Sequence, residues 1–379
     1  MPRVVISGYL GFKNNGDEAM LYAILKALDQ RVQGLEPVVL SRDPEGTREF
    51  FGVRAVPRHD LGSILAGLRR ADLLISGGGG LLQDVTGPNS ILYYLGIVTL
   101  ARMMKKPVLF YGQGIGPIRT ALGRTLMRLV ANKVDLITVR DRESKEELLD
   151  LGVIRPRVEV TADPALGLDT GEISPEPGAA ILNEAGLSAG EDLVGVSVRA
   201  WKGESAYKAV IARVCDDLAA KGRKVVFLPM HYPVDVDVSR EVAALMKQRP
   251  FIIDRELDFR EMLSLMMQTR MIMGMRLHFL IFGALLNIPM VGVSYDPKVD
   301  RFLSLVEMPA GGSVEDLDYN KLSRCIDRVE ESSQLLKAKL AEKVAVLRME
   351  ALRGADLAAE MLKKRRRETG DRRNNSLRD

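Results

Sequence analysis

The sequence predicts an α/β protein with two Rossmann-like, doubly wound domains that face a cleft. Along most of the 379 residues, apolar strands alternate with helices through short connections. The strands are continuous apolar runs, which indicates parallel sheets covered on both faces. A stretch rich in glycine and proline, residues 171–191, separates two such series and is interpreted as the interdomain linker.

The first series predicts an N-terminal domain over residues 1–170. Its strands are short runs rich in valine, isoleucine and leucine, and its helices follow glycine turns or capping residues. Strands are expected at residues 3–7, 37–41, 73–76, 107–111, 136–139 and 158–161, and helices at 18–31, 47–51, 63–70, 90–104, 121–132 and 144–151.

The second series predicts a C-terminal domain over residues 192–332. It is followed by a C-terminal helix at 333–362 and a basic tail at 363–379, which we expect to be disordered because of its charge. Strands are expected at residues 193–198, 224–229, 251–253, 271–273 and 290–294, and helices at 207–221, 238–248, 259–267, 279–286 and 319–332.

Composition is that of a globular protein. The 54 lysines and arginines exceed the 50 acidic residues by only four, and much of this excess lies in the tail. Two cysteines predict neither a disulfide framework nor a zinc site, and they fit a reducing cytosol. The N-terminal run reads as a strand rather than a signal peptide, and no apolar run predicts a transmembrane helix.

Three glycine loops follow predicted strands of the first domain. GYLGFKNNGD ends in Gly16 and Asp17, where Asp17 either caps the next helix or acts in chemistry. GGGGLLQD contains Gly78, Gly79 and Asp84; its amides suit an anion, and Asp84 suits a sugar hydroxyl or the loop itself. A third loop, GQGIGP, begins with Gly112 and Gln113; the amide of Gln113 suits a hydroxyl, although a tight turn would also explain the loop.

Cationic and aromatic residues also stand at strand ends. Arg140 follows the strand at 136–139, and Arg199 and Trp201 follow the first strand of the second domain. Arginine offers a planar fork for phosphate or carboxylate, and an indole face suits a sugar ring. His231 follows another strand and is either a substrate contact or part of a turn.

The sharpest cluster lies in MIMGMRLHFLIFGALLNIPMVGVSYDPK. Arg276 and His278 stand between a strand and a helix, and Lys298 follows the next strand. Ligands of open α/β sheets bind at this edge, and helix N-termini favour anions. Histidine titrates near neutrality and suits general acid catalysis. No carboxylate or cysteine spacing indicates a metal site, and the body lacks the basic and aromatic pattern of nucleic-acid-binding modules.

Six motifs in order carry a resemblance to a known family. They are SGYLGFKNNGDEAML, GGGGLLQD, YGQGIGP, VRDRES, TADPAL and MRLHFLIFGALLNIPMVGVSYDPKV. Together, over roughly residues 4–330, they resemble the polysaccharide pyruvyl transferase family, CsaB type. The resemblance implies a GT-B-like fold and transfer of the pyruvyl group of phosphoenolpyruvate to a sugar as a cyclic ketal, with release of phosphate.

For this chain the resemblance implies roles for His278, Arg276 and Lys298, and the strand-end positions of the other residues add further expectations. His278 is expected to be the general acid, with Asp17 assisting, and Arg140, Arg199, Arg276 and Lys298 are expected to bind phosphoenolpyruvate. The acceptor side comprises Gly16, Gly78, Gly79, Asp84, Gln113, Trp201 and His231. The implied acceptor is β-N-acetylmannosamine on undecaprenyl diphosphate, modified as a 4,6-ketal that is used in cell-wall anchoring of surface-layer proteins.

No cofactor or metal is expected beyond phosphoenolpyruvate as co-substrate. The location is expected to be cytoplasmic, at the inner face of the cell membrane, where the basic tail would meet anionic lipid; a merely solubilising tail is equally compatible. The acceptor sugar and the oligomeric state stay open. Two other readings remain: a GT-B glycosyltransferase whose Glu256 or Asp258 would bind a nucleotide ribose, and a non-catalytic protein that binds anionic glycans.

Overall fold

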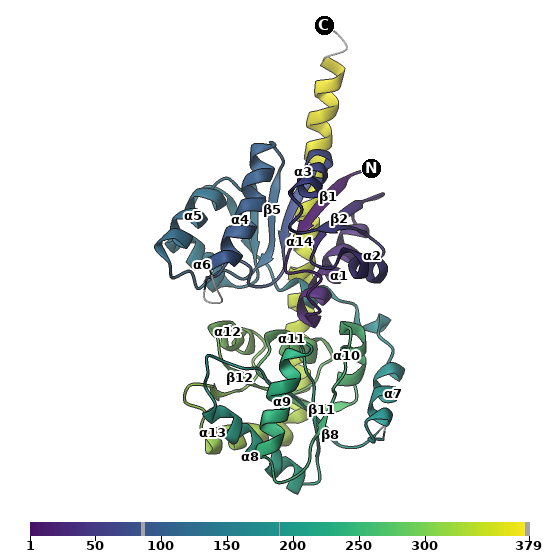
Figure 1. Cartoon of the computed structure of the whole chain (residues 1–379), viewed down its shortest axis with the longest axis vertical. Coiled ribbons are helices and arrows are strands. Elements are labelled where there is room, and N and C mark those ends of the chain that lie inside the picture. Colours follow the sequence, from purple (N-terminus) through teal and green to yellow (C-terminus); the bar gives the residue numbers. More distant parts are fainter. Residues whose placement is uncertain (85–87, 189, 376–379) are drawn as a thin grey trace. The chain divides into compact units, whose positions relative to one another are not determined.

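The computed structural model describes residues 1–84, 88–188 and 190–375 (Figure 1). The chain forms two compact units. Unit 1 comprises Met1–Phe12, Asp17–Leu168 and the chain from Leu347 onward, and unit 2 comprises Lys13–Gly16 and Asp169–Val346. The first loop motif is therefore shared between both units.

Unit 1 is built on a parallel seven-stranded sheet in the order β3-β2-β1-β4-β5-β6-β7. Ser7 at the end of β1 pairs with Leu40 on one side and Ser76 on the other, so the carboxyl ends of the central strands are level. The strands are β1 Arg3–Ser7, β2 Glu36–Ser41, β3 Arg54–Pro57, β4 Leu73–Gly77, β5 Val108–Gln113, β6 Leu136–Val139 and β7 Arg157–Val160.

Helices cover both faces of this sheet. One apolar core joins the sheet to α3, α4, α5 and α6; the other joins it to α1 and the last part of α14 (Figure 1). Each helix packs through one face, as α5 illustrates: Met127 and Ala131 are buried, while Leu122 and Leu129 face outward. The helices are α1 Asn15–Asp29, α2 Pro44–Phe51, α3 Leu61–Arg70, α4 Pro88–Met103, α5 Ala121–Ala131 and α6 Arg142–Asp150.

Unit 2 repeats the plan with a parallel six-stranded sheet in the order β10-β9-β8-β11-β12-β13. The strand order reverses between β8 and β11, which makes this parallel pair the topological switch point of the sheet. The elements are α7 Glu176–Glu184, β8 Leu193–Ser197, α8 Ala206–Ala220, β9 Lys224–Phe227, α9 Val234–Leu245, β10 Phe251–Ile252, α10 Phe259–Met266, β11 Thr269–Gly274, α11 Leu277–Leu285, β12 Met290–Ser294, α12 Pro297–Leu305, β13 Ala310–Ser313 and α13 Tyr319–Glu331.

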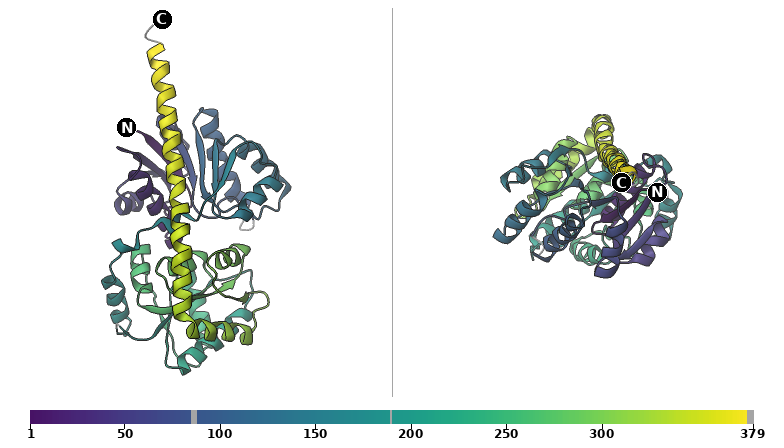
Figure 2. Two further views of the ribbon diagram at one scale, coloured as in Figure 1. Left: turned by 180° about the vertical axis from the view of Figure 1, so that it is seen from behind. Right: turned by 90° about the horizontal axis from the view of Figure 1, so that it is seen from above.

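A single long helix, α14 (Ser333–Asn375), ends the described chain (Figure 2). Its first part belongs to unit 2, and from Leu347 it belongs to unit 1. There Leu357, Ala358 and Leu362 are buried in the core below α1. The helix continues through Lys363 into the segment that composition suggested would be disordered.

The two-domain Rossmann-like prediction is confirmed by the two parallel sheets. Residues 171–191, predicted to be a linker, belong instead to unit 2 and include α7. This helix packs on α10, where the amide of Gly178 donates to the hydroxyl of Ser264 at 2.7 Å. The elements β3, α12 and β13 were also not predicted; β3 and β13 have only four residues each, and α12 begins at a proline shortly after a strand.

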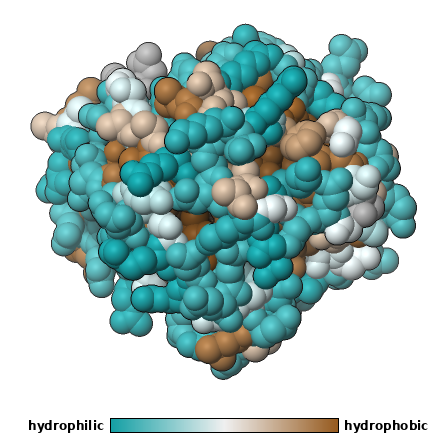
Figure 3. Space-filling view, turned by 90° about the horizontal axis from the view of Figure 1, so that it is seen from below, coloured by the Kyte–Doolittle hydropathy of each residue, from teal (hydrophilic) through white to brown (hydrophobic). Residues whose placement is uncertain are grey.

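Within the described part of the chain, no helix is both long enough and apolar enough to span a bilayer. The face shown in Figure 3 is mainly hydrophilic, with hydrophobic residues in small groups between polar ones. Exposed apolar side chains that occur in this way are ordinary for a protein surface.

The packing of α7 on α10 predicts that Gly178→Ala destabilises unit 2. A Cβ at Gly178 would lie 2.3 Å from the backbone carbon and oxygen of Ser264, which cannot move aside. We expect a loss of about 1–3 kcal/mol, measured by chemical denaturation followed through Trp201 fluorescence. The control is Gly96→Ala in α4, where a Cβ meets nothing within 4 Å and stability should hold or rise. Equal effects of both variants would contradict this account.

Candidate active site

The carboxyl edge of the unit 2 sheet gathers most of the predicted donor residues. Arg199 follows β8, Arg276 follows β11, and Lys298 lies in the first turn of α12 after β12. Because β8, β11 and β12 are neighbours in the sheet, these three cations stand at adjacent strand ends. The cluster therefore occupies the switch point, where open α/β sheets bind ligands.

Tyr295 lies at the centre of this cluster, and sequence reasoning missed it. The guanidinium of Arg199 stands 4.4 Å from its ring centroid, and the ammonium of Lys298 stands 5.2 Å from it. Trp201 packs against the same ring, with centroids 4.9 Å apart. Two cations and an indole therefore share one buried phenol, which fixes their positions relative to one another.

The electrostatic field at Tyr295 is strongly positive. Burial by itself would raise the pKa of the phenol, but the charges of Lys298, Arg199 and Arg276 lower it below its ordinary value. Among the described residues, Arg199 has no carboxylate within ion-pair distance, and its Nε donates only to the carbonyl of Ala200 at 3.4 Å. The cluster is therefore suited to receive an anion.

A buried carboxylate, Asp235, holds Arg276 in place. Its side chain is fully buried; it accepts from Nε of Arg276 at 3.0 Å and from Nη2 of the same guanidinium. It also accepts from the backbone amide of His231 at 3.1 Å. The predicted residue His231 is thus tied to Arg276 through Asp235, a partner that the sequence did not reveal.

His278 lies in the first turn of α11 and packs on a segment from the start of the chain. Gly16 belongs to unit 2, and a Cβ there would lie 2.3 Å from the imidazole Cγ and Nδ1. The same segment pairs through Asn14 with His231 as an antiparallel bridge, and the amide of Asn15 donates to the carbonyl of Met230 at 3.3 Å. The structure therefore brings Gly16, His231 and His278 together.

The start of α11 adds backbone donors beside these side chains. Arg276 occupies the N-cap position, and its side chain makes no capping hydrogen bond. The first amides of a helix lack intrahelical partners and carry partial positive charge. Together with Arg199 and Lys298, this helix end gives the edge both positive charge and hydrogen-bond donors, a combination that suits an anion.

Unit 1 brings a second set of predicted residues together. Gly78 and Gly79 both have positive φ, 89° and 67°, which glycine adopts without strain. They wrap around α1: a Cβ on Gly79 would lie 3.1 Å from Oδ1 of Asp17, and its amide lies 3.2 Å from the sulfur of Met20. Close approach of the loop to Asp17 therefore requires glycine at position 79.

Arg140 has a carboxylate partner inside unit 1. It is 8% exposed, and its Nη1 donates to the carboxylate of Asp163 at 3.1 Å. Its Nε lies 3.6 Å from a carboxylate oxygen of Asp141. Its guanidinium also lies against Gly114, where a Cβ would be 2.5 Å from Nη2. This pairing gives Arg140 a structural part in joining the GQGIGP and TADPAL loops, and its predicted donor-binding role stays a prediction.

Asp84 and Gln113 are likewise engaged within unit 1. The carboxylate of Asp84 accepts from the amides of Arg119 and Thr120, each at 2.8 Å. Burial raises the pKa of Asp84, but these bonds more than offset it and leave the pKa below its usual value. Gln113 is fully buried and donates to the carbonyl of Ser76 at 2.9 Å. Both side chains brace the loops around them.

Glu18, also missed from the sequence, braces the first loop. Its carboxylate accepts from the amide of Gly11 at 2.9 Å and from that of Phe12. Burial raises its pKa to about 7, and the nearby charges of Asp17 and Asp43 act in the same direction. The sequence shows a glutamate in the first turn after a glycine loop, but it does not show that this side chain is buried.

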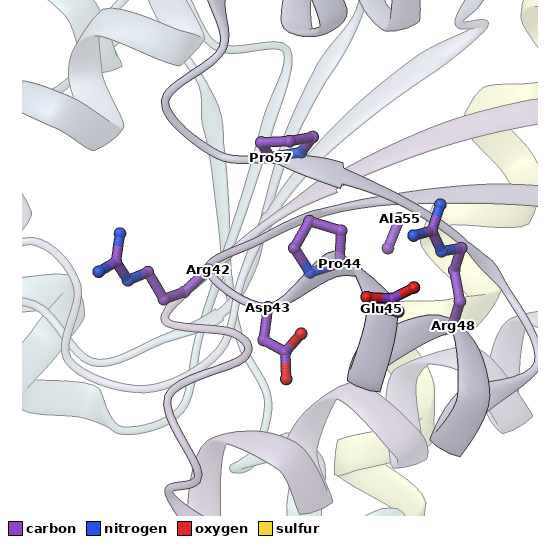
Figure 4. Close-up of a pocket in the computed structure, with 7 residues that line it drawn as sticks. All are labelled: Arg42, Asp43, Pro44, Glu45, Arg48, Ala55 and Pro57. Carbon is purple, nitrogen blue, oxygen red and sulfur yellow. The ribbon is translucent and has the colours of Figure 1, made fainter.

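A surface hollow of about 570 Å³ opens elsewhere in unit 1 (Figure 4). It lies between β3 and the start of α2, and its lining residues are Arg42, Asp43, Pro44, Glu45, Arg48, Ala55 and Pro57. Asp43 is occupied as the N-cap of α2, and the charges around the hollow balance. It offers none of the convergent polar groups that the Tyr295 cluster presents.

Comparison with known proteins identifies the family. The family model described as polysaccharide pyruvyl transferase matches residues 14–297, three quarters of the chain. The chain belongs to the polysaccharide pyruvyl transferase family. The match begins at Asn14, two residues before Gly16, and extends through Arg276 and His278 to the first residue of α12.

A curated relative and several solved structures are also similar to this chain. Amylovoran biosynthesis protein AmsJ of Erwinia amylovora is 22% identical over 333 residues, covering 83% of this chain and 78% of AmsJ. The S. aureus MnaA–UDP structure has a TM-score of 0.65 at 14% identity and covers 94% of both chains. Anabaena HepE with UDP-glucose gives the same TM-score and identity, over 96% and 100%. At such identities, the structural likeness concerns the fold alone.

Membership in the pyruvyl transferase family confirms the resemblance at the level of the family, and the CsaB type stays a prediction. Within the described residues, no group of three histidine, cysteine, aspartate or glutamate side chains is placed to hold a metal ion. The side chains at the cationic edge of unit 2 are those of Arg199, Arg276 and Lys298, with His278 beside them.

The pKa of Glu18 generates a prediction about unit 1. Because its folded pKa is raised from 4.5 to about 7, its contribution to stability is fully present below pH 4.5 and is lost as the pH rises through 7. Glu18→Gln keeps an acceptor for Gly11 but cannot ionise. We expect it to remove up to about 3 kcal/mol of the decline in stability between pH 5 and pH 8.

Hydrogen exchange in β1, corrected for intrinsic exchange rates, would report the opening free energy of unit 1 at both pH values. Glu45→Gln, at an exposed glutamate in the first turn of α2, is the matched control. If the opening free energy of Glu18→Gln changes with pH as that of the wild type does, ionisation of the Glu18 carboxyl costs the fold little free energy.

Proposed function

We propose that this chain transfers the pyruvyl group of phosphoenolpyruvate to two hydroxyls of a polysaccharide sugar, forming a cyclic ketal and releasing phosphate. The observation that supports this most is the group of cations around Tyr295 in a chain of this family. Phosphoenolpyruvate carries a phosphate and a carboxylate on adjacent atoms, and a clustered set of cations matches that charge distribution.

The arrangement supports distinct tasks for the cations. Arg276 is oriented by Asp235, so its guanidinium is pre-organised to face a ligand in one direction. Arg199 and Lys298 flank Tyr295 and supply charge that no described carboxylate fully neutralises; Lys298 lies 3.7 Å from Asp296. We assign the phosphate and carboxylate to this group together with the first amides of α11.

His278 is proposed as the proton donor. Its proton moves to the methylene carbon of phosphoenolpyruvate, which makes C2 electrophilic, and a sugar hydroxyl adds at C2 with loss of its proton. The C2–O bond to phosphate then breaks, and phosphate leaves with the bonding electrons. The second hydroxyl adds at C2 and closes the ketal. Of the two hydroxyl protons, one restores the imidazolium and one leaves with phosphate. Asp17 is kept as a candidate base for the acceptor.

The identity of the acceptor is proposed from the resemblance of the sequence motifs to the CsaB type. It would be a β-N-acetylmannosamine on undecaprenyl diphosphate, ketalated at O4 and O6 for surface-layer anchoring, in the cytoplasm at the inner membrane face. Gly78, Gly79 and Trp201 are proposed to contribute to its binding. Trp201 offers a partly exposed indole, and its Nε1 lacks a hydrogen-bond partner among the described residues.

A nucleotide-sugar glycosyltransferase is the second candidate, because the fold also occurs in Anabaena HepE with UDP-glucose. The two acidic side chains considered for a ribose are otherwise engaged. Glu256 pairs with Lys13 at 2.8 Å, and Asp258 forms the capping box of α10 with Glu261. This favours phosphoenolpyruvate as the donor. A passive glycan-binding role is disfavoured by family membership.

The decisive experiment incubates the protein with phosphoenolpyruvate and a lipid-linked N-acetylmannosamine–N-acetylglucosamine acceptor. We expect phosphate release matched by a mass gain of one pyruvyl group on the acceptor. His278→Ala should reduce the rate by about 100-fold or more, as expected for loss of a general acid. Lys247→Ala, at an exposed lysine beyond α9, should not change it. Transfer from UDP-sugars instead, or full activity of His278→Ala, would overturn the assignment.

The basic end of α14 is proposed to contact anionic lipid. Lys363, Lys364, Arg366 and Arg367 are exposed, whereas Arg365 reaches the carbonyl of Lys105 at 3.5 Å. Basic residues near an anionic leaflet contribute about 1 kcal/mol each.

Replacing these four exposed residues by glutamine should therefore weaken binding to phosphatidylserine vesicles at least 100-fold. Co-sedimentation at low and high salt measures this, with neutral phosphatidylcholine vesicles and Lys339→Gln as controls. If the fourfold variant binds phosphatidylserine vesicles as the wild type does, the basic tail does not contact lipid and only increases solubility.

A further inference from the structure

Arg58 is a buried arginine that the proposed reaction does not use. It directly follows β3 in unit 1 and is only 6% exposed. Three aromatic rings surround its guanidinium carbon: Tyr93 at 4.2 Å, Phe12 at 5.1 Å and Tyr94 at 5.5 Å from their centroids. Arg58 and these three rings are named here the Arg58 cage.

The hydrogen bonds of the Arg58 guanidinium are few and long, although the backbone carbonyl of Arg58 accepts from the hydroxyl of Tyr93 at 2.8 Å. Nη1 donates to the carbonyl of Gly8 at 3.4 Å, and Nη2 donates to the hydroxyl of Tyr94 at 3.5 Å. Nε is buried and has no hydrogen-bond partner in the described chain. Two arginines from the predicted donor set differ: Arg140 reaches Asp163 at 3.1 Å, and Arg276 reaches Asp235 at 3.0 Å.

Arg58 also has no carboxylate within 4 Å among the described residues. Burying an unpaired charge is costly, and cation–π contacts offset only part of that cost. Such a group is kept only where another interaction makes up the difference. An external anion that accepts from Nε and a terminal nitrogen would do so, because a guanidinium binds phosphate or carboxylate through two parallel bonds.

The surroundings of Arg58 favour an anion attached to a sugar. Phe12 and Tyr93 are partly exposed and stand beside the guanidinium, and Phe12 stacks on Tyr9 with centroids 3.9 Å apart. Burial raises the pKa of Tyr94 to about 12, although the charge of Arg58 acts to lower it. Its hydroxyl therefore stays neutral; it accepts from Arg58 and keeps a proton to donate. Aromatic faces with a few convergent donors are typical of ligand sites.

We propose that the Arg58 cage is a binding subsite in unit 1 for the anionic group of a saccharide, either a phosphate or a carboxylate. This rests on the proposed function insofar as the saccharide is the acceptor. Arg58 binds the anion, Tyr94 donates to it, and Phe12 and Tyr93 line the adjoining sugar ring. The loop from Gly8 to Phe12, braced by Glu18, then belongs to the acceptor side.

The test measures binding by the full-length protein, without the reaction. Isothermal titration with N-acetylglucosamine 1-phosphate, glucuronic acid and neutral N-acetylglucosamine is made in the presence of saturating phosphoenolpyruvate. We expect one or both anionic sugars to bind, and the neutral sugar to bind at least tenfold more weakly. Preference for the phosphate points to the lipid-proximal end of the acceptor, and preference for the uronate to a carboxylate within the polymer.

Variants separate a binding role from a structural one. Arg58→Gln should weaken the anionic sugar at least tenfold and leave thermal stability without ligand unchanged or higher, because it removes an unpaired buried charge. Arg58→Lys keeps the charge without the fork and covers the case in which Arg58→Gln does not fold; it should also weaken binding. Arg54→Gln, at an exposed arginine in β3, is the control and should bind normally.

Two outcomes overturn the subsite. One is equal affinity of wild type and both Arg58 variants for the anionic sugars. The other is binding of none of the probes by wild type together with a lower melting temperature of Arg58→Gln, which would make Arg58 a structural plug between rings. Failure of the proposed function looks different: the wild type would bind the anionic sugar through Arg58 and yet release no phosphate from phosphoenolpyruvate.

Discussion

The cationic edge of unit 2 depends on the buried carboxylate of Asp235. It accepts from two nitrogens of Arg276 and from the amide of His231, so one fully buried side chain ties the end of β11 to the loop after β9. Ion pairs of this kind contribute little net stability, but removal of one partner leaves an unpaired buried charge. Their value here is positional, because Arg276 must face one direction for a ligand to meet it.

Around that fixed pair, positive charge accumulates without full compensation. Arg199, Lys298 and Arg276 all lower the pKa of Tyr295, against the effect of its burial. Like charges gathered at a sheet edge repel one another, and this repulsion is relieved when a dianion enters. The charge distribution at the proposed donor site therefore favours an anionic ligand. The same reasoning applies in unit 1 to Arg58, whereas Arg140 carries its own counter-charge in Asp163.

Strand ends were predictable from the sequence, but the partners of the residues at those ends were not. Continuous apolar runs located the central strands, and the parallel order then placed Arg199, Arg276 and Lys298 on one edge. Asp163 and Asp235 are separated in sequence from the arginines they bind, so no local pattern revealed that Arg140 is neutralised and Arg276 oriented.

Local chemistry also misled the assignment of elements. The prolines and glycine at residues 175–178 suggested a linker, yet proline is compatible with the first turn of a helix, and Gly178 is needed where α7 meets α10. The strand β13, AGGS, has too little apolar character to be recognised.

Gly16 shows most sharply how tertiary contacts change the meaning of a motif. The loop GYLGFKNNGD suggested glycines that let a ligand approach the backbone, yet Gly16 does not have a positive φ. Its requirement is steric: the imidazole of His278 occupies the space that any Cβ would fill. The motif is divided after Phe12 and after Gly16, so four residues from the start of the chain form part of unit 2 beside the proposed proton donor. A residue 262 positions away along the chain thereby sets where His278 can stand, which neither motif discloses when read separately.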